Sequence, residues 1–323
     1  MPLLLTEADV RAILTMPLAL EAVETSFRRL GDGAATSHPR RRLLIPGKTI
    51  LNYMAAADSG GGYLGLKIYS IARGKARFVV PLFRAETGEM AALIEADYLG
   101  QMRTGAASGV AAKVMARADA RTVAIIGTGL QARTQLEAVA HARKLERINA
   151  FGRDAERREK FAKEMTERLG VPVTRASSAE AAVRGADIVI TSTTSKTPVV
   201  EGRWIEPGTH ISAIGSNFAE KREIDTEAVR RCDVIAADSV EQSKIESGDL
   251  IQTFAGDESR WAMVREFAEI VAGKVPGRTS PEQVTLFKSN GIAIEDIVTA
   301  GRVYELAQQR GIGRDIPMWQ GEA

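Results

Sequence analysis

Short apolar runs alternate with stretches of helical spacing through the middle of the chain, from about residue 121 to residue 237. The runs are rich in the Val, Ile and Ala typical of buried strands, and the stretches between them repeat apolar residues as amphipathic helices do. Strands that alternate with helices in this way form a parallel sheet covered by helices on both faces. The pattern predicts an α/β fold, a doubly wound Rossmann-type sheet of six strands at residues 123–126, 147–151, near 173, 187–191, 210–214 and 233–237.

The first third of the chain has a different pattern. Residues 6–30 predict two short helices, and β-type segments then follow one another at residues 42–46, 49–54, 63–71, 78–83 and 90–94. A turn at residues 86–89 joins the last two segments, which indicates hairpins in an antiparallel or mixed sheet. This smaller α+β domain leads into an alanine-rich helix from residue 99 to about residue 118.

Helical spacing returns near the C-terminus, over residues 283–300 and 303–307. We expect one long helix there that packs back on the first domain. The sequence therefore predicts a discontinuous domain of residues 1–117 and 299–323, and a Rossmann domain of residues 118–298.

A glycine turn follows the first strand of the predicted Rossmann domain. Gly127 permits a tight turn, Gly129 lets backbone N–H groups approach a pyrophosphate, and Ala132 keeps the next helix close to the strand. Leu130 and Gln131 occupy the first turn of that helix. This pattern alone also fits a glycine-rich turn in an unrelated doubly wound domain, but its place between a strand and a helix favours a bound NAD or NADP.

The end of the second strand bears on the choice of cofactor. NAD enzymes usually carry an acidic residue there, whereas NADP enzymes avoid that charge and supply an arginine for the 2′-phosphate. Gly152 occupies the expected acidic position and Arg153 follows it. We favour NADP over NAD, although Asp154 lies close by; its alternative role is to cap the next helix.

Composition excludes several other classes of protein. Hydrophobic residues make up 45% and charged residues 26% of the 323 residues, and the formal net charge is +2, so neither disorder nor a nucleic-acid or membrane partner is favoured. One cysteine, Cys232, and three scattered histidines give no disulfide and no metal-ligand spacing, so no metal is expected, and His210 is expected to be structural. Without an apolar run near 18 residues or a signal segment, we expect a cytoplasmic protein.

Three charged residues stand in or beside apolar segments outside the Rossmann unit. Lys67 interrupts a β-type run, Arg42 begins one, and Arg103 lies at the start of the alanine-rich helix. Each has a plain structural alternative, since a charge on a strand or helix is usually solvated. For Arg42, which follows Arg40 and Arg41, that alternative is the stronger one.

Together, six motifs resemble the ornithine cyclodeaminase/mu-crystallin family, which includes ketimine and pyrroline-2-carboxylate reductases and archaeal-type alanine dehydrogenases. They occur in order at residues 42–46, 65–67, 102–108, 126–132, 214–217 and 286–291. The resemblance implies a homodimer whose first domain, completed by C-terminal residues, supplies the dimer interface and the substrate pocket. It also implies chemistry through a 2-imino acid.

The resemblance assigns roles to matching residues. Arg42 and Arg103 would hold the substrate carboxylate, a task suited to the planar fork of arginine. Lys67 would act beside the imine or amine as an acid, a base or a donor, provided that burial and the arginines lower its pKa. The cofactor would be contacted by Thr104 at the phosphates and by residues near the ribose or nicotinamide, namely Thr193, Ile214 and Gly215.

One residue departs from the cyclodeaminases of this family. They carry an aspartate where this chain has Asn217, and that carboxylate assists ring closure onto the imine. Asn217 is neutral, so it could orient a substrate by hydrogen bonds or simply cap a following helix. Pocket size would depend further on Met54 and Asn290, so we count both as candidate substrate-binding residues.

The favoured function is therefore NAD(P)H-dependent reduction of the C=N bond of a small 2-imino acid, either a cyclic ketimine such as 1-pyrroline-2-carboxylate or 1-piperideine-2-carboxylate, or an open imine. An alanine dehydrogenase-like oxidative deaminase is the second hypothesis, and an ornithine cyclodeaminase is a third. A non-catalytic protein that binds NADP and a small ligand, as mu-crystallin-like proteins can, is the fourth.

Overall fold

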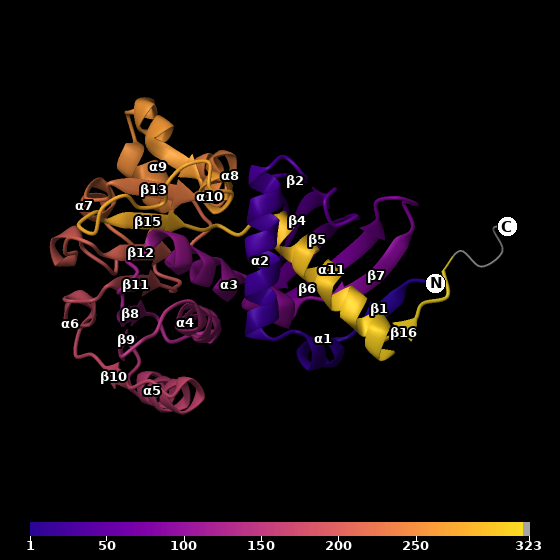
Figure 1. The fold of residues 1–323 in the computed structure, drawn as a ribbon, viewed down its shortest axis with the longest axis horizontal. Helices are drawn as coiled ribbons and strands as arrows, with labels where there is room; N and C mark the ends of the chain where they lie inside the picture. Colours follow the sequence, from indigo (N-terminus) through magenta and orange to yellow (C-terminus); the bar gives the residue numbers. More distant parts are fainter. Residues whose placement is uncertain (319–323) are drawn as a thin grey trace. The chain divides into compact units, whose positions relative to one another are not determined.

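The chain forms two compact units in a computed structural model that describes residues 1–318 (Figure 1). Unit 1 comprises Met1–Arg103 and Ile292–Ala323, and unit 2 comprises Thr104–Gly291. The division differs from the boundaries expected from the sequence, because it falls inside the alanine-rich helix α3 (Asp97–Met115). Residues 319–323, at the end of the predicted first domain, lie outside the described residues.

Unit 1 contains a mixed sheet. Its central strands are antiparallel neighbours, as the hairpin pattern predicted, and β1 joins them in parallel with β7. The order is β16-β1-β7-β6-β5-β4-β2, and β3 also pairs with β4. The strands are β1 (Leu3–Leu5), β2 (Ala35–Ser37), β3 (Arg41–Ile45), β4 (Thr49–Asp58), β5 (Tyr63–Ala72), β6 (Lys75–Arg84), β7 (Met90–Glu95) and β16 (Arg314–Asp315).

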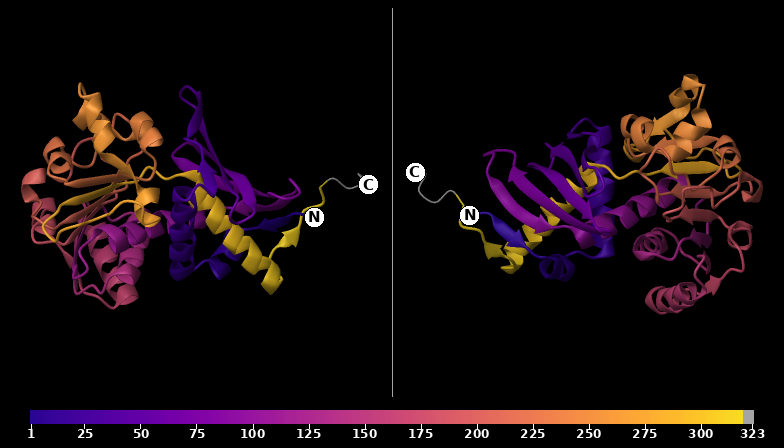
Figure 2. Two further views of the ribbon diagram at one scale, coloured as in Figure 1. Left: turned by 45° about the horizontal axis from the view of Figure 1, so that its top comes forward. Right: turned by 180° about the vertical axis from the view of Figure 1, so that it is seen from behind.

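The two faces of this sheet differ. Helices α2 (Met16–Gly31) and α11 (Ala293–Arg310) cover one face, and α1 (Glu7–Ile13) packs beside them (Figure 1). Side chains alternate between faces along a strand, and residues paired across strands share a face. The opposite face, seen from behind in Figure 2, exposes Leu43, Leu51 and Leu64 by 60%, 36% and 39%.

Unit 2 contains a parallel sheet in the order β10-β9-β8-β11-β12-β15-β13-β14. All six predicted strands are present, so the Rossmann-type fold class is confirmed. The strands are β8 (Thr122–Ile126), β9 (Arg147–Phe151), β10 (Val173–Arg175), β11 (Ile188–Thr191), β12 (His210–Ala213), β13 (Val234–Ala237), β14 (Val264–Glu266) and β15 (Thr285–Lys288).

The prediction of one long helix over residues 283–300 was wrong in its first part. Residues 285–288 form β15, which lies between β12 and β13, and α11 begins only at Ala293. All four residues of β15 are buried, and a short run buried on both sides has no periodicity that separates a strand from a helix.

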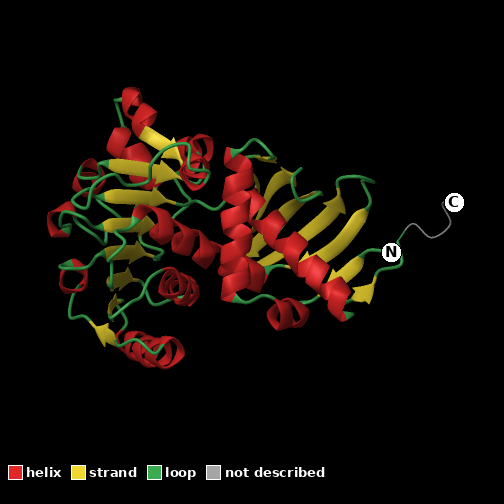
Figure 3. Cartoon of the chain, viewed as in Figure 1, coloured by secondary structure: helices red, strands yellow, loops and turns green. Residues whose placement is uncertain are grey.

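Helices cover both faces of the sheet of unit 2 (Figure 3). Alternate residues of β8 enter different apolar clusters, Val123 and Ile125 one and Ala124 and Ile126 the other. The helices, besides the part of α3 that belongs here, are α4 (Leu130–Ala142), α5 (Ala155–Leu169), α6 (Ala179–Val183), α7 (Thr226–Arg230), α8 (Val240–Glu246), α9 (Gly248–Phe254) and α10 (Phe267–Val271), with 3-10 turns at Gly202–Trp204 and Glu258–Met263.

The strand order of unit 2 reverses between β8 and β11. From β8 the chain runs to β9 and β10 on one side and then returns to β11 on the other. Ligands of open α/β sheets bind at such a switch point, outside the carboxyl ends of the strands. The glycine turn after β8 and the loop after β11 meet there.

His210 and Cys232, the histidine and the cysteine considered above, are both buried in unit 2. His210 is buried, with its ring nitrogens 2.9 Å from Thr285 Oγ1 and 3.1 Å from Ser212 Oγ, and burial lowers its pKa to about 3. Cys232 is a buried free thiol. Among residues 1–318, no helix combines the length and apolar character needed to cross a membrane.

Candidate active site

The glycine turn has the geometry of a phosphate cradle. Gly127 has a φ of +111°, and a Cβ at this position would overlap the carbonyl oxygen of Ser192. Gly129 is the N-cap of α4, makes no side-chain capping bond, and has open space where a Cβ would stand. The first N–H groups of α4 have no partner within the helix, so they can donate to an anion.

A cavity of about 830 Å³ opens beside this turn. Of the residues predicted to bind the cofactor, Gly127, Gly129, Arg153 and Thr193 line it. The open cradle above Gly129 and the size of the cavity fit a dinucleotide. The neighbouring wall is mostly small or hydroxylated and consists of Ser192, Thr194, Ser195, Thr197 and Val199.

The other predicted cofactor residues are not among those that line the cavity. Leu130 is exposed on the first turn of α4, Gln131 follows it, and Ala132 is fully buried against the sheet. The Thr104 carbonyl accepts a 3.0 Å bond from Gln135 Nε2 of α4. Two further residues follow β12 and do not line the cavity, namely Ile214 and Gly215.

Gly152 lines the cavity and packs closely against the Thr128 side chain. A Cβ on Gly152 would stand 2.7 Å from Thr128 Oγ1. Arg153 is exposed and lines the cavity with Arg157. Asp154 caps α5, accepting a 3.0 Å bond from the Arg157 N–H, as its alternative role predicted.

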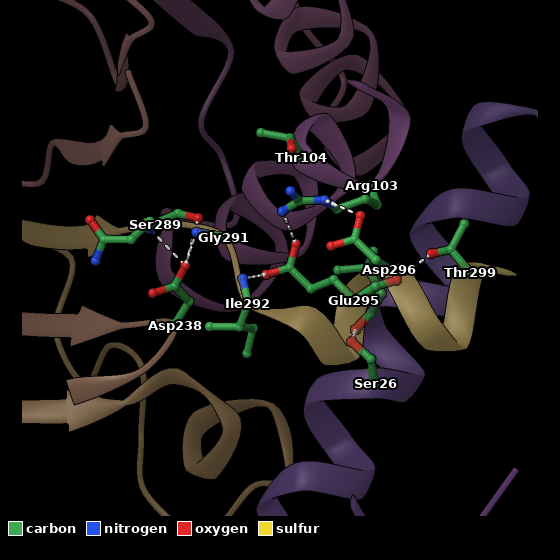
Figure 4. Close-up of polar contacts among 12 residues, drawn as sticks. Ser26, Arg103, Thr104, Asp238, Ser289, Gly291, Ile292, Glu295, Asp296 and Thr299 are labelled. Carbon is green, nitrogen blue, oxygen red and sulfur yellow. Dashed lines mark hydrogen bonds and ion pairs between the residues drawn. The ribbon is translucent and has the colours of Figure 1, made fainter. Parts of the chain in front are cut away.

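Unit 1 gathers a second group of charged residues, all buried. Lys67 Nζ donates to Asp296 Oδ1 at 2.8 Å, and Arg103 Nε donates to the same oxygen at 3.1 Å. Arg103 Nη1 also donates to Glu295 Oε2 at 2.9 Å. Figure 4 shows Arg103 reaching both carboxylates at the start of α11. The second oxygen of Asp296 is buried and has no hydrogen-bond partner among the described residues.

These surroundings change the acidity of Lys67. Burial lowers its pKa from 10.5 to about 8, and the charges of Arg103 and Arg40 act in the same direction, while Asp296 opposes them. The side chain is 3% exposed, so the surface alternative considered for it does not hold. Arg103, at 6% exposure, is not a surface charge either. A buried lysine with this pKa can exchange protons near neutral pH.

Arg42 and Met54 lie on the same face of the sheet as Lys67. Met54 is the cross-strand partner of Lys67, and Arg42 is the partner of Asn52. Met54 is almost fully buried, whereas Arg42 is partly buried. The amide nitrogen of Asn52 is buried and has no hydrogen-bond partner within residues 1–318. This face of unit 1 thus combines cations with neutral side chains.

Sequence reasoning missed three residues of this group. Glu295 and Asp296 stand in the first turn of a helix, where acidic residues are common because they complement the helix dipole. Arg40 belonged to an apparently solvated basic run but is 6% exposed. Only the three-dimensional contact with Lys67, which is 229 residues away from Asp296, distinguishes that aspartate.

The remaining candidates, Asn217 and Asn290, belong to unit 2. Asn217 follows β12 and does not cap a helix, because the next helix, α7, is capped by Asp225. Asn290 is held by a bond from its amide to Ser243 Oγ and by one from its backbone N–H to Asp238 Oδ2. The same carboxylate binds Ser289 and Gly291, as Figure 4 shows for these two residues.

Known proteins are similar to this chain over most of its length. The chain is 35% identical over 271 residues to a Delta(1)-pyrroline-2-carboxylate reductase of Bacillus cereus, covering 81% of this chain and 83% of that one. The structure of Thermococcus litoralis Delta(1)-pyrroline-2-carboxylate reductase in complex with NADH and L-proline matches with a TM-score of 0.89 and 36% identity, over 97% and 100% of the two chains.

An archaeal alanine dehydrogenase dimer with bound NAD matches with a TM-score of 0.92 and 32% identity, over 98% of this chain and 99% of that one. The two solved structures contain NADH or NAD. The family model described as the ornithine cyclodeaminase/mu-crystallin family matches residues 1–311. The chain belongs to the ornithine cyclodeaminase/mu-crystallin family.

Proposed function

We propose that the protein is an NAD(P)H-dependent reductase of the C=N bond of small 2-imino acids. The observation that carries this proposal is the buried group of Lys67, Arg103 and Asp296, in which one carboxylate oxygen accepts from both cations. Such a group can bind a carboxylate and supply a proton at a fixed place. A purely structural protein has no need to bury these charges.

Each cation has a separate task in this proposal. Arg103 and Arg42 hold the substrate carboxylate, since guanidinium groups pair with carboxylates in a fixed geometry. Lys67, with a pKa of about 8, is mostly protonated at neutral pH and donates a hydrogen bond or a proton to the imine nitrogen. Asp296 keeps the ammonium of Lys67 in place. With the imine nitrogen protonated, the carbon of the C=N bond accepts a hydride, and the product is a 2-amino acid.

Gly127, Gly129 and the first turn of α4 would hold the cofactor pyrophosphate, with Thr104, Leu130, Gln131 and Ala132 supporting that turn. Bound there, a dihydronicotinamide supplies the hydride. We propose that NADPH is preferred to NADH. Gly152 stands where NAD enzymes usually carry an acidic residue, and Arg153 and Arg157 line the cavity beside it. Both features support this preference, because the 2′-phosphate needs cations. Asp154 also lines the cavity, but its carboxylate accepts the Arg157 N–H as the cap of α5.

We propose a cyclic ketimine, such as 1-pyrroline-2-carboxylate, as the substrate. Where the cyclodeaminases of this family carry an aspartate, this chain has the neutral Asn217. The distal ammonium of ornithine would lack that carboxylate partner, whereas a hydrocarbon ring needs none. The bound L-proline of the Thermococcus relative is the reduced form of that ring.

We also propose a homodimer formed through the outer face of the sheet of unit 1. Leu43, Leu51 and Leu64 are exposed on that face, and an apolar groove of about 410 Å³ runs beside Leu64. Exposed apolar patches of this kind commonly mark protein interfaces. The archaeal alanine dehydrogenase is a dimer, which supports a dimeric state.

The cytoplasm is the proposed location. A reductase of this kind depends on a continuous supply of reduced nicotinamide cofactor, which cytoplasmic metabolism regenerates. The single buried thiol also needs no oxidising compartment.

A substrate panel tests the proposed function. Purified protein is mixed with NADPH or NADH and a preformed cyclic ketimine, with pyruvate plus ammonia, or with ornithine plus oxidised cofactor. Oxidation of NADPH by the ketimine without ammonia is the expected result. A requirement for pyruvate and ammonia would instead identify an alanine dehydrogenase, and ornithine consumed without net cofactor change a cyclodeaminase. Tight NADPH binding without any turnover would favour a binding protein.

A further inference from the structure

We infer that Glu223 is a positioning residue that fixes the two loops following β11 and β12 and thereby sets the affinity for the nicotinamide half of the cofactor. This inference rests on the proposed function in one respect, the assignment of Thr193 and Gly215 to the nicotinamide-ribose end. Glu223 itself did not enter the sequence-based assignment of the site, although two of its partners, Thr193 and Gly215, did.

The Glu223 carboxylate binds both loops at once. Its Oε1 accepts the backbone N–H of Thr193 at 2.6 Å, and its Oε2 accepts the N–H of Gly215 at 2.6 Å. Oε2 also accepts a 2.8 Å bond from Thr191 Oγ1, at the end of β11. The side chain is fully buried. Both oxygens therefore act as acceptors, and neither loop can move without breaking a hydrogen bond to a charged group.

The first of these loops forms a wall of the dinucleotide cavity. Thr193 lines the cavity, and Ser192 packs so closely on Gly127 that no Cβ fits between them. Gly215 is equally crowded, since a Cβ there would overlap Thr193 and the Glu223 carboxylate. A displacement of Thr193 would thus be transmitted directly to the glycine turn.

A second charged pair fixes Glu223 itself. Asp249 Oδ1 accepts the N–H groups of Glu223 and Ile224 at 2.7 and 3.1 Å. The other Asp249 oxygen lies 3.0 Å from Lys288 Nζ, and this ammonium donates to the Ser216 carbonyl at 2.8 Å. A chain of contacts through Glu223, Asp249 and Lys288 therefore connects the carboxyl ends of β11, β12 and β15.

Burying these three charged side chains costs free energy, which indicates that they serve a purpose other than stability. Glu223, Asp249 and Lys288 are all fully buried, so two carboxylates face one ammonium away from water. Burial and the charge of Asp249 raise the pKa of Glu223. Apolar residues of similar volume would stabilise a core at least as well. What only the charged group provides is simultaneous hydrogen bonding to two loops that approach the ligand.

Glu223→Gln tests the inference. Glutamine has the same shape, but it offers one acceptor and one NH₂ group, so it must lose the bond to one loop. Affinity is measured by titration calorimetry for the cofactor that the wild type prefers and for its adenosine half, which is adenosine 2′,5′-bisphosphate for NADPH or ADP for NADH. We expect the dissociation constant of the whole cofactor to rise about 10- to 100-fold and that of the adenosine half to change less than about twofold.

Asp187→Asn is the matched control. Asp187 also accepts backbone N–H groups, those of Arg121 and Thr122, but it does so at the amino end of the sheet. The control should lower thermal stability without changing either affinity. If Glu223→Gln weakens both ligands equally, or weakens neither, the inference is overturned.

If Glu223→Gln does not fold, Thr191→Val carries the test, because it removes one donor to Oε2 and leaves both backbone bonds. A several-fold loss of affinity confined to the whole cofactor is then expected, and an equal or absent change for the two ligands overturns the inference. These binding measurements need no substrate. A protein that reduces no imino acid but shows the selective loss would refute the proposed reaction and leave the role of Glu223 intact.

Discussion

Replacing Asp296 by asparagine probes the link between the buried charges of unit 1 and catalysis. Asparagine keeps the size of the side chain and an acceptor oxygen, but it removes the negative charge that Lys67 and Arg103 share. Asp296 is a positioning residue in this account. Its loss should act through the orientation and the acidity of Lys67.

The size of the effect follows from the two hydrogen bonds. A hydrogen bond to a charged group contributes about 1.5 to 3 kcal/mol and a bond between neutral groups about 0.5 to 1.5 kcal/mol. In Asp296→Asn the donors stay charged and only the acceptor becomes neutral, so each bond loses part of its strength. Asp296→Asn should therefore cost about 1 kcal/mol for each bond, or about 2 kcal/mol together. If both cations act in the transition state, kcat/KM falls about 30-fold. The pKa of Lys67 should also fall below about 8, because Asp296 raises it.

The assay is the pH dependence of kcat/KM for ketimine reduction. In Asp296→Asn the alkaline limb, which is the fall of kcat/KM at alkaline pH that reports the loss of the Lys67 proton, should move to lower pH. Glu295→Gln is the matched control, since Glu295 binds Arg103 whereas the hydrogen bond of Lys67 goes to Asp296. That control should raise KM and leave the limb in place. An unmoved alkaline limb in Asp296→Asn, or an equal displacement in both variants, would show that Asp296 does not set the acidity of Lys67.

Three further predictions concern acidity, cofactor choice and assembly. Wild-type kcat/KM for reduction should be constant at neutral pH and fall above about pH 8, because the lowered pKa of Lys67 places the loss of its proton there; a profile unchanged to pH 10 would contradict this. Arg153→Ala should raise the dissociation constant of NADPH about tenfold and leave that of NADH unchanged, as measured by calorimetry. Leu51→Asp should convert a dimer into a monomer in light scattering after gel filtration, and a wild type that is already monomeric would refute the proposed interface.

The parts of the fold that could be predicted from the sequence are those with local causes. Gly127 needs a positive φ and close contact with its surroundings, and both requirements leave a trace in the sequence. The alternation of buried strands and helices likewise predicts the Rossmann-type sheet. The insertion of β15 between β12 and β13 left no such trace, because pairing order depends on distant strands.

The site was predictable only in part for the same reason. Lys67 and Arg103 stand out because charges interrupt apolar segments, and the family resemblance marks them. Asp296 and Glu223 look like ordinary acidic residues near a helix start or in a loop. Their partners lie up to 229 residues away in sequence, so their roles emerge only from folded contacts.

The reduction of preformed 1-pyrroline-2-carboxylate by wild type and by Lys67→Met tests whether Lys67 supplies the proton in imine reduction. Methionine fills the buried space of the lysine stem but cannot donate a proton. We expect the wild type to oxidise one NADPH for each cyclic amino acid formed, and Lys67→Met to lose about 100- to 10,000-fold in kcat with an unchanged dissociation constant for the cofactor. Turnover retained in Lys67→Met would contradict the assignment of the proton to Lys67.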